Sequence, residues 1–465
     1  MVPPGVLHGG TTFVAGGSLP NLSRLDVRGT ANWDGDLSIA GKAMNFYLPT
    51  TMTAGGKMLD VSGTADITGS TVNVGISGSS SPLRTGDTVI LVDADTLIGA
   101  PVNSTTSGQG MLGVTLLYDF DITTNPTASQ LLATVSSSGS GPRINPQTKA
   151  LSEGFVSGMA LATQGGDTLA GPGMNNAVSA AKSTGAGTAP ALVGFGALSG
   201  GSMRFNSGSH VDMRSVSLLA GLAYGADINP GRLTLGAFFE YGSGSYDTYN
   251  SFSNAASVKG TGDTWYIGGG ILGHMSFVDT GPGHFYTEGS FRAGRLHNEY
   301  NNSDLRDFTG RSAGYESSSN YYSFHLGTGY VWNFTDKASF DIYGKYFWTR
   351  LQGDSVTLST GEQVNFKDTN SSRLRGGGRL TYAINEHVSP YIGAAYEREF
   401  DGKARATTNG FDIPAPSLRG NTGIGEFGLT LKPSLNLPLS FDLGVQGYTG
   451  KREGVTGSLQ IRYEF

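Results

Sequence analysis

The chain has 465 residues, of which 72 are glycine, 10% are aromatic and 15% are charged. The charged fraction lies well below the roughly 25% of an average soluble domain, and a chain rich in glycine and aromatic residues but poor in helix formers favours many β-strands. The formal net charge of −6 argues against a nucleic-acid-binding protein, which is normally basic. The absence of cysteine excludes disulfide frameworks and thiolate metal sites.

The apolar runs of the sequence are short. None approaches the roughly 18–20 consecutive apolar residues that a membrane-spanning helix requires. A membrane location would therefore need a β-barrel, the other fold that satisfies every backbone polar group in lipid. The first residues, MVPPGVLHGG, contain neither the basic nor the apolar region of a secretory signal peptide. We therefore expect further residues to precede this sequence in a longer precursor.

Residues 1–145 are rich in glycine, serine, threonine and valine, and short apolar pairs recur between turn residues. Examples are Leu22 and Leu25, Leu37 and Ile39, and the stretch from Met58 to Val61. Short, evenly spaced strands fit the stacked rungs of a β-solenoid better than a sandwich of long strands. Residues 86–94 (GDTVILVDA) predict a fully buried strand that caps the open end of the solenoid.

The period changes in residues 146–190. Asn145 and Pro146 predict the start of a helix, as cap and first-turn proline. Apolar residues then recur at helical spacing, at Leu151, Phe155, Met159 and Ala162. We expect Gly165-Gly166 to break the helix and Ala177–Ala181 to form a weaker second one. Small residues dominate both pieces, as a helix threading a narrow lumen would require, although an ordinary interdomain linker would also fit.

Residues 191–465 contain segments in which two kinds of side chain alternate. In Tyr321–Phe334, one face carries Tyr322, Phe324, Leu326, Thr328, Tyr330, Trp332 and Phe334, and the other carries Ser323, His325, Gly327, Gly329, Val331 and Asn333. A period of two places alternate side chains on opposite faces of a sheet. An apolar face with aromatic ends opposite a small or polar face is typical of a membrane barrel, whereas a soluble barrel has apolar residues inside.

Twelve such segments follow one another, an even number, as in single-chain bacterial barrels. They begin near Leu192, Arg214, Arg232, Thr264, Phe285, Tyr321, Ser339, Ser372, Val388, Leu418, Leu439 and Val455. Tight turns at 227–231 and 384–387 contrast with longer polar connections at 250–262, 301–319 and 403–417. Short turns belong on the periplasmic side of such barrels and long loops on the outside.

Charged residues of both signs fall on the polar face by parity. They are Glu240, Glu288, Arg292, Asp341, Lys345, Arg373, Arg375, Arg379, Glu397, Glu399, Glu426 and Arg462. In a narrow lumen these charges would pair with one another and with the linker, because charged groups form the stronger hydrogen bonds. We expect them to hold the helix and to close the pore to ions. General hydration of a pore is the alternative that parity leaves open.

Several short segments carry a resemblance to a known family. They are Lys149–Gly154, Gln164–Asp167, Arg373–Arg379, Tyr396–Gly402 and Arg462–Phe465. In this order, residues 146–465 resemble the translocator unit of type V secretion autotransporters, and residues 50–100 resemble the last rungs of the family's pertactin-like β-helical passengers. The resemblance implies a 12-stranded antiparallel transmembrane β-barrel with an α-helical plug, preceded by a right-handed β-helix fragment.

The resemblance also implies a division of the chain. Residues 1–145 would be the end of the passenger with an autochaperone-like cap, residues 146–190 a linker through the lumen, and residues 191–465 the outer-membrane barrel. A protein of this family exports its own N-terminal passenger and anchors it at the cell surface, and many such passengers are adhesins. The implied partners are outer-membrane lipid, the barrel-assembly machinery and periplasmic chaperones. The barrel would be monomeric and would bind no cofactor.

The last segment alternates up to the end of the sequence. Val455, Gly457, Leu459 and Ile461 share one face with Tyr463 and Phe465. An exposed final strand is a surface that assembly factors recognise by strand addition. The resemblance implies that Tyr463 and Phe465 form the outer-membrane insertion signal.

Asn175-Asn176 is a candidate site of self-cleavage. Some members of the family cut themselves between paired asparagines inside the barrel, and this pair lies shortly before the first strand. The flanking Met174 and Ala177 do not resemble that subgroup. A role of these asparagines in a loop or a helix cap is the alternative.

The signals of enzymes are weak. Gly423–Gly428 fits the pattern G-x-G-x-x-G, but no helix-opening pattern follows it. The histidines show no metal-binding spacing. We therefore expect no catalytic residue, metal or cofactor. Two alternatives from other classes remain: a porin with residues 1–145 as an external domain, and a barrel hydrolase with a serine–histidine pair on its strands.

Overall fold

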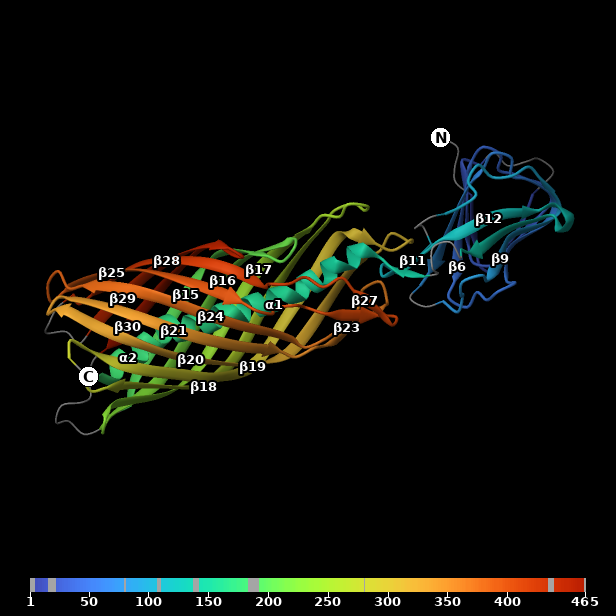
Figure 1. Ribbon diagram of the computed structural model, residues 1–465. Coiled ribbons are helices and arrows are strands. Elements are labelled where there is room, and N and C mark those ends of the chain that lie inside the picture. The colour runs from blue at the N-terminus through green and yellow to red at the C-terminus, as the bar shows by residue number, and fades with distance from the viewer. Residues whose placement is uncertain are drawn as a thin grey trace.

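The computed structural model contains an elongated β-barrel with a helix along its axis and a smaller β-unit beyond one end (Figure 1). It describes residues 5–15, 22–78, 81–106, 110–136, 142–182, 192–279, 281–433 and 439–463. Within these ranges, no helix is both long enough and apolar enough to cross a membrane.

The N-terminal unit consists mainly of parallel strands in two sheets. One sheet has the order β1 (Gly5–His8), β3 (Arg24–Arg28), β6 (Ala43–Pro49) and β8 (Thr71–Ser77). The other pairs β2 (Thr12–Val14), β4 (Ala31–Asp34), β7 (Lys57–Asp66) and β9 (Thr88–Ile98) in parallel, with β5 (Leu37–Ser38) beside β7. The chain passes alternately between the sheets and so forms the stacked rungs that the sequence indicates. The handedness of the coil stays a prediction.

The core of this solenoid comes from strand residues that alternate inward. In β6, Met44, Phe46 and Leu48 are buried, and in β8 Val72 and Val74 are buried. A single rung cannot bury its apolar face alone, so each rung depends on its neighbours. The apolar periodicity of residues 1–145 therefore becomes one continuous core.

The prediction of a fully buried strand at residues 86–94 is wrong. Val89, Leu91 and Val92 of β9 are buried, but Asp93 lies on the outer face. The reason is that β9 covers the core with one face only. A hairpin of β12 (Phe120–Asn125) and β13 (Gln130–Val135), joined by the turn η1 (Pro126–Ala128), continues the sheet, and β13 pairs antiparallel with β9.

A small antiparallel sheet connects the solenoid to the barrel. It has the order β10 (Gly110–Leu112), β11 (Leu116–Tyr118) and β14 (Arg143–Ile144). Asn145 follows β14, and its side chain accepts a hydrogen bond from the backbone N–H of Gln147 (3.1 Å). The predicted cap and first-turn proline are thus confirmed in the turn η2 (Pro146–Thr148).

The helical segment then continues without a gap. It comprises α1 (Lys149–Thr168), a π-helical turn η3 (Leu169–Gly173) and α2 (Met174–Lys182). The predicted break at Gly165-Gly166 is wrong, because both glycines lie inside α1, where Gly165 packs closely against Tyr266 and Arg292 of the barrel wall. The irregularity falls instead at η3, which contains Pro172. Proline has no N–H for the helix ladder, and a wider turn accommodates the loss.

The barrel closes from twelve antiparallel strands, and its last strand pairs with its first. The strands are β15 (Leu192–Asn206), β16 (His210–Ile228), β17 (Gly231–Asn250), β18 (Val258–Phe277), β19 (Gly283–Arg306), β20 (Ser312–Thr335), β21 (Ala338–Leu351), β24 (Thr369–Tyr382), β25 (Val388–Glu399), β28 (Gly420–Leu431), β29 (Leu439–Gly450) and β30 (Arg452–Tyr463). The number of strands and their order along the chain are as predicted.

The two faces of the barrel strands differ as the alternation predicts. In β20, Leu326 and Trp332 are exposed on the outside, whereas Ser323 and His325 are buried on the inside. Large apolar side chains are exposed around the whole barrel, including Ile271, Ile342, Ile392, Phe427 and Ile461. An outward apolar surface of this kind is suited to lipid.

The predicted long connections are more ordered than loops. The stretch 301–319 belongs mostly to β19 and β20, which extend toward the solenoid and turn at residues 307–311. The stretch 403–417 contains β26 (Ala406–Thr408) and β27 (Phe411–Ile413). These strands join β22 (Ser355–Thr357) and β23 (Gln363–Phe366) in a sheet of order β22-β23-β26-β27, here called the mouth sheet. It lies at the end of the barrel that faces the solenoid (Figure 1).

Candidate functional site

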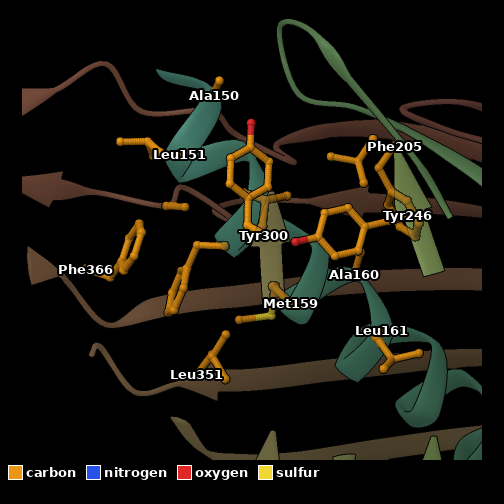
Figure 2. Packing of buried hydrophobic residues seen from close by; sticks show 14 of the residues in the cluster. Ala150, Leu151, Met159, Ala160, Leu161, Phe205, Tyr246, Tyr300, Leu351 and Phe366 are labelled. Carbon is orange, nitrogen blue, oxygen red and sulfur yellow. The ribbon is translucent and has the colours of Figure 1, made fainter. Parts of the chain in front are cut away.

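The N-terminal half of α1 packs into the barrel through apolar side chains. Leu151 and Met159 lie among Tyr300, Leu351 and Phe366 (Figure 2), and all five are buried. In the same cluster, the rings of Phe155 and Phe366 stack with centroids 4.5 Å apart. The helical spacing read from the sequence therefore marks the face of α1 that contacts the barrel wall and the mouth sheet.

Glycines set the distance between the helix and the wall. A Cβ atom added at Gly158 would lie 2.8 Å from the side chain of Leu296, closer than real Cβ contacts allow. A Cβ atom at Gly165 would overlap the side chains of Tyr266 and Arg292. Small residues in this segment therefore allow the helix to fit the lumen, as the sequence suggests.

Asp167 of α1 lies in a cluster of three arginines and one glutamate from the wall, here called the arginine clamp. One carboxylate oxygen of Asp167 is 2.8 Å from Arg373 and 2.7 Å from Arg375, and the other is 2.7 Å from Arg452. Glu397 accepts hydrogen bonds from the same three arginines at 2.7–3.0 Å. The clamp joins the helix to β24, β25 and β30.

The charges of the clamp depend on one another. The side chains of Arg373 and Glu397 are each 2% exposed, and that of Asp167 is 10% exposed. Buried charges persist when they are paired, and removal of one partner leaves an uncompensated charge that costs about 3–5 kcal/mol. Three guanidinium groups face two carboxylates, so loss of the helix would leave Glu397 alone with three positive charges. The geometry therefore favours the helix in the lumen.

Two further wall charges hold backbone carbonyl groups of the helical segment. Arg292 donates a hydrogen bond to the carbonyl oxygen of Ala162 and also bonds Glu240 at 2.8 Å. Lys345 donates to the carbonyl oxygen of Ala170 at 2.6 Å and lies 2.7 Å from Glu288. The second contact falls in the π turn, where the regular pattern of helix hydrogen bonds changes.

Polar contacts continue along the helical segment to its C-terminal end. Near the mouth, Asn298 donates to the carbonyl oxygen of Gly154 at 3.1 Å. In α2, Asn176 donates to the carbonyl oxygens of Gly196 and Ile461 at 2.5 and 3.2 Å. Arg232 donates to the carbonyl oxygen of Ala181 at 2.5 Å. The helix is thus bonded to the wall over its whole length.

Other residues predicted for the lumen do not contact the helix in this way. Arg379 and Glu426 form their own pair at 2.7 Å, Asp341 accepts from Tyr286, and Glu399 accepts from the N–H of Ser372. The reason is the position of the helix, since α1 packs mainly against β16–β19 and is bonded to β24 only through the arginine clamp. A cavity of about 20 Å³, lined by Pro172, Asn175, Arg379 and Glu426 among others, separates this pair from the helix. The side chain of Arg462 lies outside the described residues.

Sequence reasoning missed Arg452 as a lumen residue. It has the same parity as Thr456, Ser458 and Gln460, so extension of the last strand by three residues would have found it. The sequence indicates Asp167 only as part of a family motif. No pattern in the helical segment marks it as the partner of the clamp, because the rotation of the helix depends on its packing.

The paired asparagines lie in α2. Asn176 is buried and holds the two carbonyl groups described above, whereas Asn175 is exposed to the cavity shared with Glu426. Both carboxylate oxygens of Glu426 accept from Arg379, at 2.7 and 2.9 Å. The structure therefore brings an acid near Asn175 but gives that acid another partner. Self-cleavage stays a prediction.

A serine–histidine pair lies on the lumen side of β19 and β20. The hydroxyl oxygen of Ser290 is 2.5 Å from Nδ1 of His325, whose Nε2 is 3.4 Å from Glu288. Glu288 also pairs with Lys345, so the group belongs to the contacts that hold Ala170. Gly423–Gly428 lies within β28, with no helix after it. Among the described residues, no group of His, Asp and Glu side chains could hold a metal ion.

A barrel of twelve strands with its own helix bonded inside the lumen can be compared with known proteins. Residues 195–444, more than half of the chain, match the family model of the autotransporter β-domain. The chain belongs to the autotransporter family. It is therefore an outer-membrane translocator for a passenger, and the barrel itself is a secretion barrel rather than an enzyme. The resemblance of the barrel region to autotransporter translocators is confirmed, and that of residues 50–100 to the family's passengers stays a prediction.

Solved structures of autotransporter barrels are similar to this chain. The transport unit of AIDA-I from Escherichia coli is 19% identical, with 59% of this chain and 90% of that chain covered and a TM-score of 0.47. The translocator domain of NalP from Neisseria meningitidis is 17% identical, with 68% and 99% covered and a TM-score of 0.48. The β-domain of the Bordetella autotransporter BrkA is 15% identical, with 59% and 100% covered and a TM-score of 0.44. A search of curated proteins finds no match.

Proposed function

We propose that this autotransporter displays its own residues 1–145 at the cell surface as the end of a passenger. The solenoid lies beyond the end of the barrel that carries the long β19–β20 hairpin and the mouth sheet (Figure 1). The opposite end carries tight turns, such as the one between Ile228 and Gly231. Long connections outside and short turns on the periplasmic side are the rule for such barrels, which supports a surface position for the solenoid.

The second part of the proposal is that residues 146–190 are the linker of export and remain in the lumen as a plug. The arginine clamp carries this proposal, because Asp167 supplies the carboxylate that the three wall arginines share with Glu397. A passenger exported through the lumen must leave a segment behind that spans it. A helix rises about 1.5 Å per residue, so about 20 residues cross a hydrocarbon core of about 30 Å. The segment Lys149–Lys182 exceeds that length.

The partners follow from the same proposal. The barrel closes with its own strands, which suits a monomer in outer-membrane lipid. We propose that periplasmic chaperones deliver it and that the barrel-assembly machinery recognises β30, which ends at Tyr463. Phe465 lies outside the described residues. Replacement of Phe465 with Ser should lower the yield of inserted barrel much more than replacement of Glu464 with Gln, measured by heat-modifiable migration. Equal yields would contradict the signal.

Conductance in planar lipid bilayers tests the plug. The intact chain should be nearly closed, and deletion of residues 167–183 should give a large, steady conductance. Asp167→Asn should raise the open fraction by at least about tenfold, because it leaves the clamp arginines under-compensated. Glu399→Gln is the matched control, since Glu399 bonds Ser371, Ser372 and Asp401 rather than the helix. A porin-like conductance of the intact chain would favour the channel alternative.

The hydrolase alternative from the sequence rests on the contacts among Ser290, His325 and Glu288. We expect no hydrolysis, because the side chains of His325 and Glu288 are each 3% exposed and Glu288 is paired with Lys345. A serine-reactive fluorophosphonate probe distinguishes a hydrolase from a barrel without hydrolytic activity. Labelling of the folded protein that disappears in Ser290→Ala would support the hydrolase.

The activity of the passenger stays a prediction. Adhesion is the role implied by the family resemblance, and an enzymatic passenger is an alternative. Binding of cells that display the chain to immobilised host-matrix proteins, compared with cells that display residues 146–465, would test adhesion. Equal binding of the two strains would remove the support for it.

A further inference from the structure

A groove lies on the outer face of the barrel, at the seam where the last strand pairs with the first. Gly457 of β30 and Gly200 of β15 are directly opposite each other there. Because neither has a side chain, the neighbouring Val216, Phe427 and Val445 surround an opening of about 560 Å³. This volume falls within the roughly 300–1,000 Å³ that is usual for ligand pockets.

The groove belongs to the surface of the barrel that faces lipid. Its rim consists of apolar side chains of β15, β16, β28 and β29 that are exposed on the outside, among them Leu198, Leu443 and Val445. Apolar groups of this kind favour contact with an apolar environment over contact with water. The groove therefore fits an acyl chain of the surrounding membrane.

A second depression, of about 420 Å³, lies beside the groove on the side of the mouth. On β16, Val216 lines the groove, and Arg214 lines the depression. Arg214 is the nearer of the two to Ser209, whose hydroxyl bonds Lys149 at the start of α1 (2.7 Å). A strand rises about 3.3 Å per residue, so the two positions on β16 are about 7 Å apart. A lipid with its acyl chain in the groove would place its head group in the depression.

The depression contains one arginine that is not paired. Arg204 and Asp212 neutralise each other through two hydrogen bonds, of 2.6 and 2.7 Å. Arg214 is exposed, and its guanidinium group makes no hydrogen bond or ion pair with the residues that the structure describes. A guanidinium group binds phosphate through parallel N–H groups. Arg214 is therefore available for the phosphate of a lipid.

The carboxylates of the depression outnumber its arginines. Asp247 lies directly opposite Asp212 on the neighbouring strand, an arrangement of like charges that destabilises a sheet. Glu453 lies opposite Arg204, whose guanidinium group already bonds Asp212. A cationic group of a ligand, placed beside Asp247 and Glu453, would reduce this repulsion.

We propose that the groove and the depression together bind a phospholipid with a phosphoethanolamine head group. One acyl chain lies in the groove over Gly200 and Gly457. The phosphate lies at Arg214, and the ammonium group lies beside Asp247 and Glu453. A head group with a negative charge alone would bring no cation to the surplus carboxylates, and like charges brought together at an interface cost free energy. This site goes beyond the export and display of the passenger.

The bound lipid covers the seam of the barrel. At Gly200 and Gly457, no side chain lies over the outer face of the two joining strands. A ligand that binds the folded barrel but not the unfolded chain stabilises the fold. Phosphatidylethanolamine should therefore raise the temperature at which the barrel unfolds on electrophoresis more than phosphatidylglycerol does.

Native mass spectrometry of the full chain in detergent tests the site, with phosphatidylethanolamine and phosphatidylglycerol of identical acyl chains added separately. The wild-type barrel should bind phosphatidylethanolamine about tenfold more tightly. Gly457→Leu should abolish this binding, because its side chain fills the groove. Gly425→Leu is the matched control, since Gly425 is an exposed glycine of β28 outside the groove, with nothing within 4 Å of an added Cβ atom. Equal binding by the two variants would overturn the proposal.

The contacts of the head group are tested separately. Arg214→Gln should weaken the binding of both lipids about tenfold, because both carry a phosphate. The double variant Asp247→Asn, Glu453→Gln should lose only the preference for phosphatidylethanolamine, so that the two affinities become equal. Heat-modifiable migration shows that each variant is folded. A preference that survives in the double variant, or a wild-type barrel that binds both lipids equally, would overturn the proposed head group.

Discussion

Asp167 shows how much of the site rests on single side chains. Wall charges such as Arg373 and Arg375 could be predicted from parity, because a strand alternates its faces with a period of two. Their helix partner could not be predicted, since the rotation of a helix inside a barrel depends on which small residues meet which bulky ones. Gly158 and Gly165 fix that rotation in the structure. The sequence therefore predicted the charged residues of the barrel wall but not Asp167, their partner on the helix.

Gly165→Leu should weaken the packing of the helix against the inner wall of the barrel. Its side chain would collide with Tyr266 and Arg292, and overpacking of this kind costs about 1–3 kcal/mol. The temperature at which the barrel unfolds on electrophoresis should fall, and conductance should rise. Gly171→Ala is the matched control, because nothing lies within 4 Å of an added Cβ atom there. Equal behaviour of the two variants would mean that the fit at Gly165 does not hold the helix.

At the scale of elements, the helical segment was the least well predicted. Gly165-Gly166 reads as a break by propensity, but tertiary packing keeps both residues helical. The irregularity lies instead at Pro172, in the π-helical turn η3. Polar strand extensions at 301–319 were read as a loop because strands outside lipid lack apolar alternation. The barrel strands inside the lipid zone were predicted well because their apolar and polar side chains alternate.

A row of hydrogen-bonded polar side chains, here called the polar ladder, joins neighbouring strands of the solenoid, and its contribution to stability can be tested. Asn45 donates to Asp26 at 2.6 Å and accepts from Asn73 at 2.8 Å, across the neighbouring strands β3 and β8. Asn45→Ala should lower the stability of the solenoid by about 1–3 kcal/mol, because it leaves the 1% exposed Asp26 without this donor. Protease resistance of the passenger in increasing urea measures the loss. Asn32→Ala, at an exposed position of β4, should have little effect, and an equal loss there would remove the role of the ladder.

The whole molecule combines an apolar outer surface, a bonded helix and a solenoid beyond the mouth. The number of strands and their faces follow from the period of the sequence, and the family follows from the match to residues 195–444. The mouth sheet was not predicted, because it forms between β22–β23 and β26–β27, two hairpins that are distant in sequence and too short to show a periodic pattern. The contacts of the mouth sheet with α1 are therefore visible only in three dimensions.

The position of the helix inside an outer-membrane barrel is the central claim, and thiol labelling tests it most directly. The chain has no native cysteine, so a single Ala177→Cys or Ser303→Cys variant reports one site. Ala177 is 0% exposed inside the barrel, and Ser303 is exposed on the β19–β20 hairpin. On intact cells, a bulky maleimide should label Ser303→Cys readily and leave Ala177→Cys unlabelled until the barrel is denatured. Equal labelling of both in the folded barrel would contradict the account.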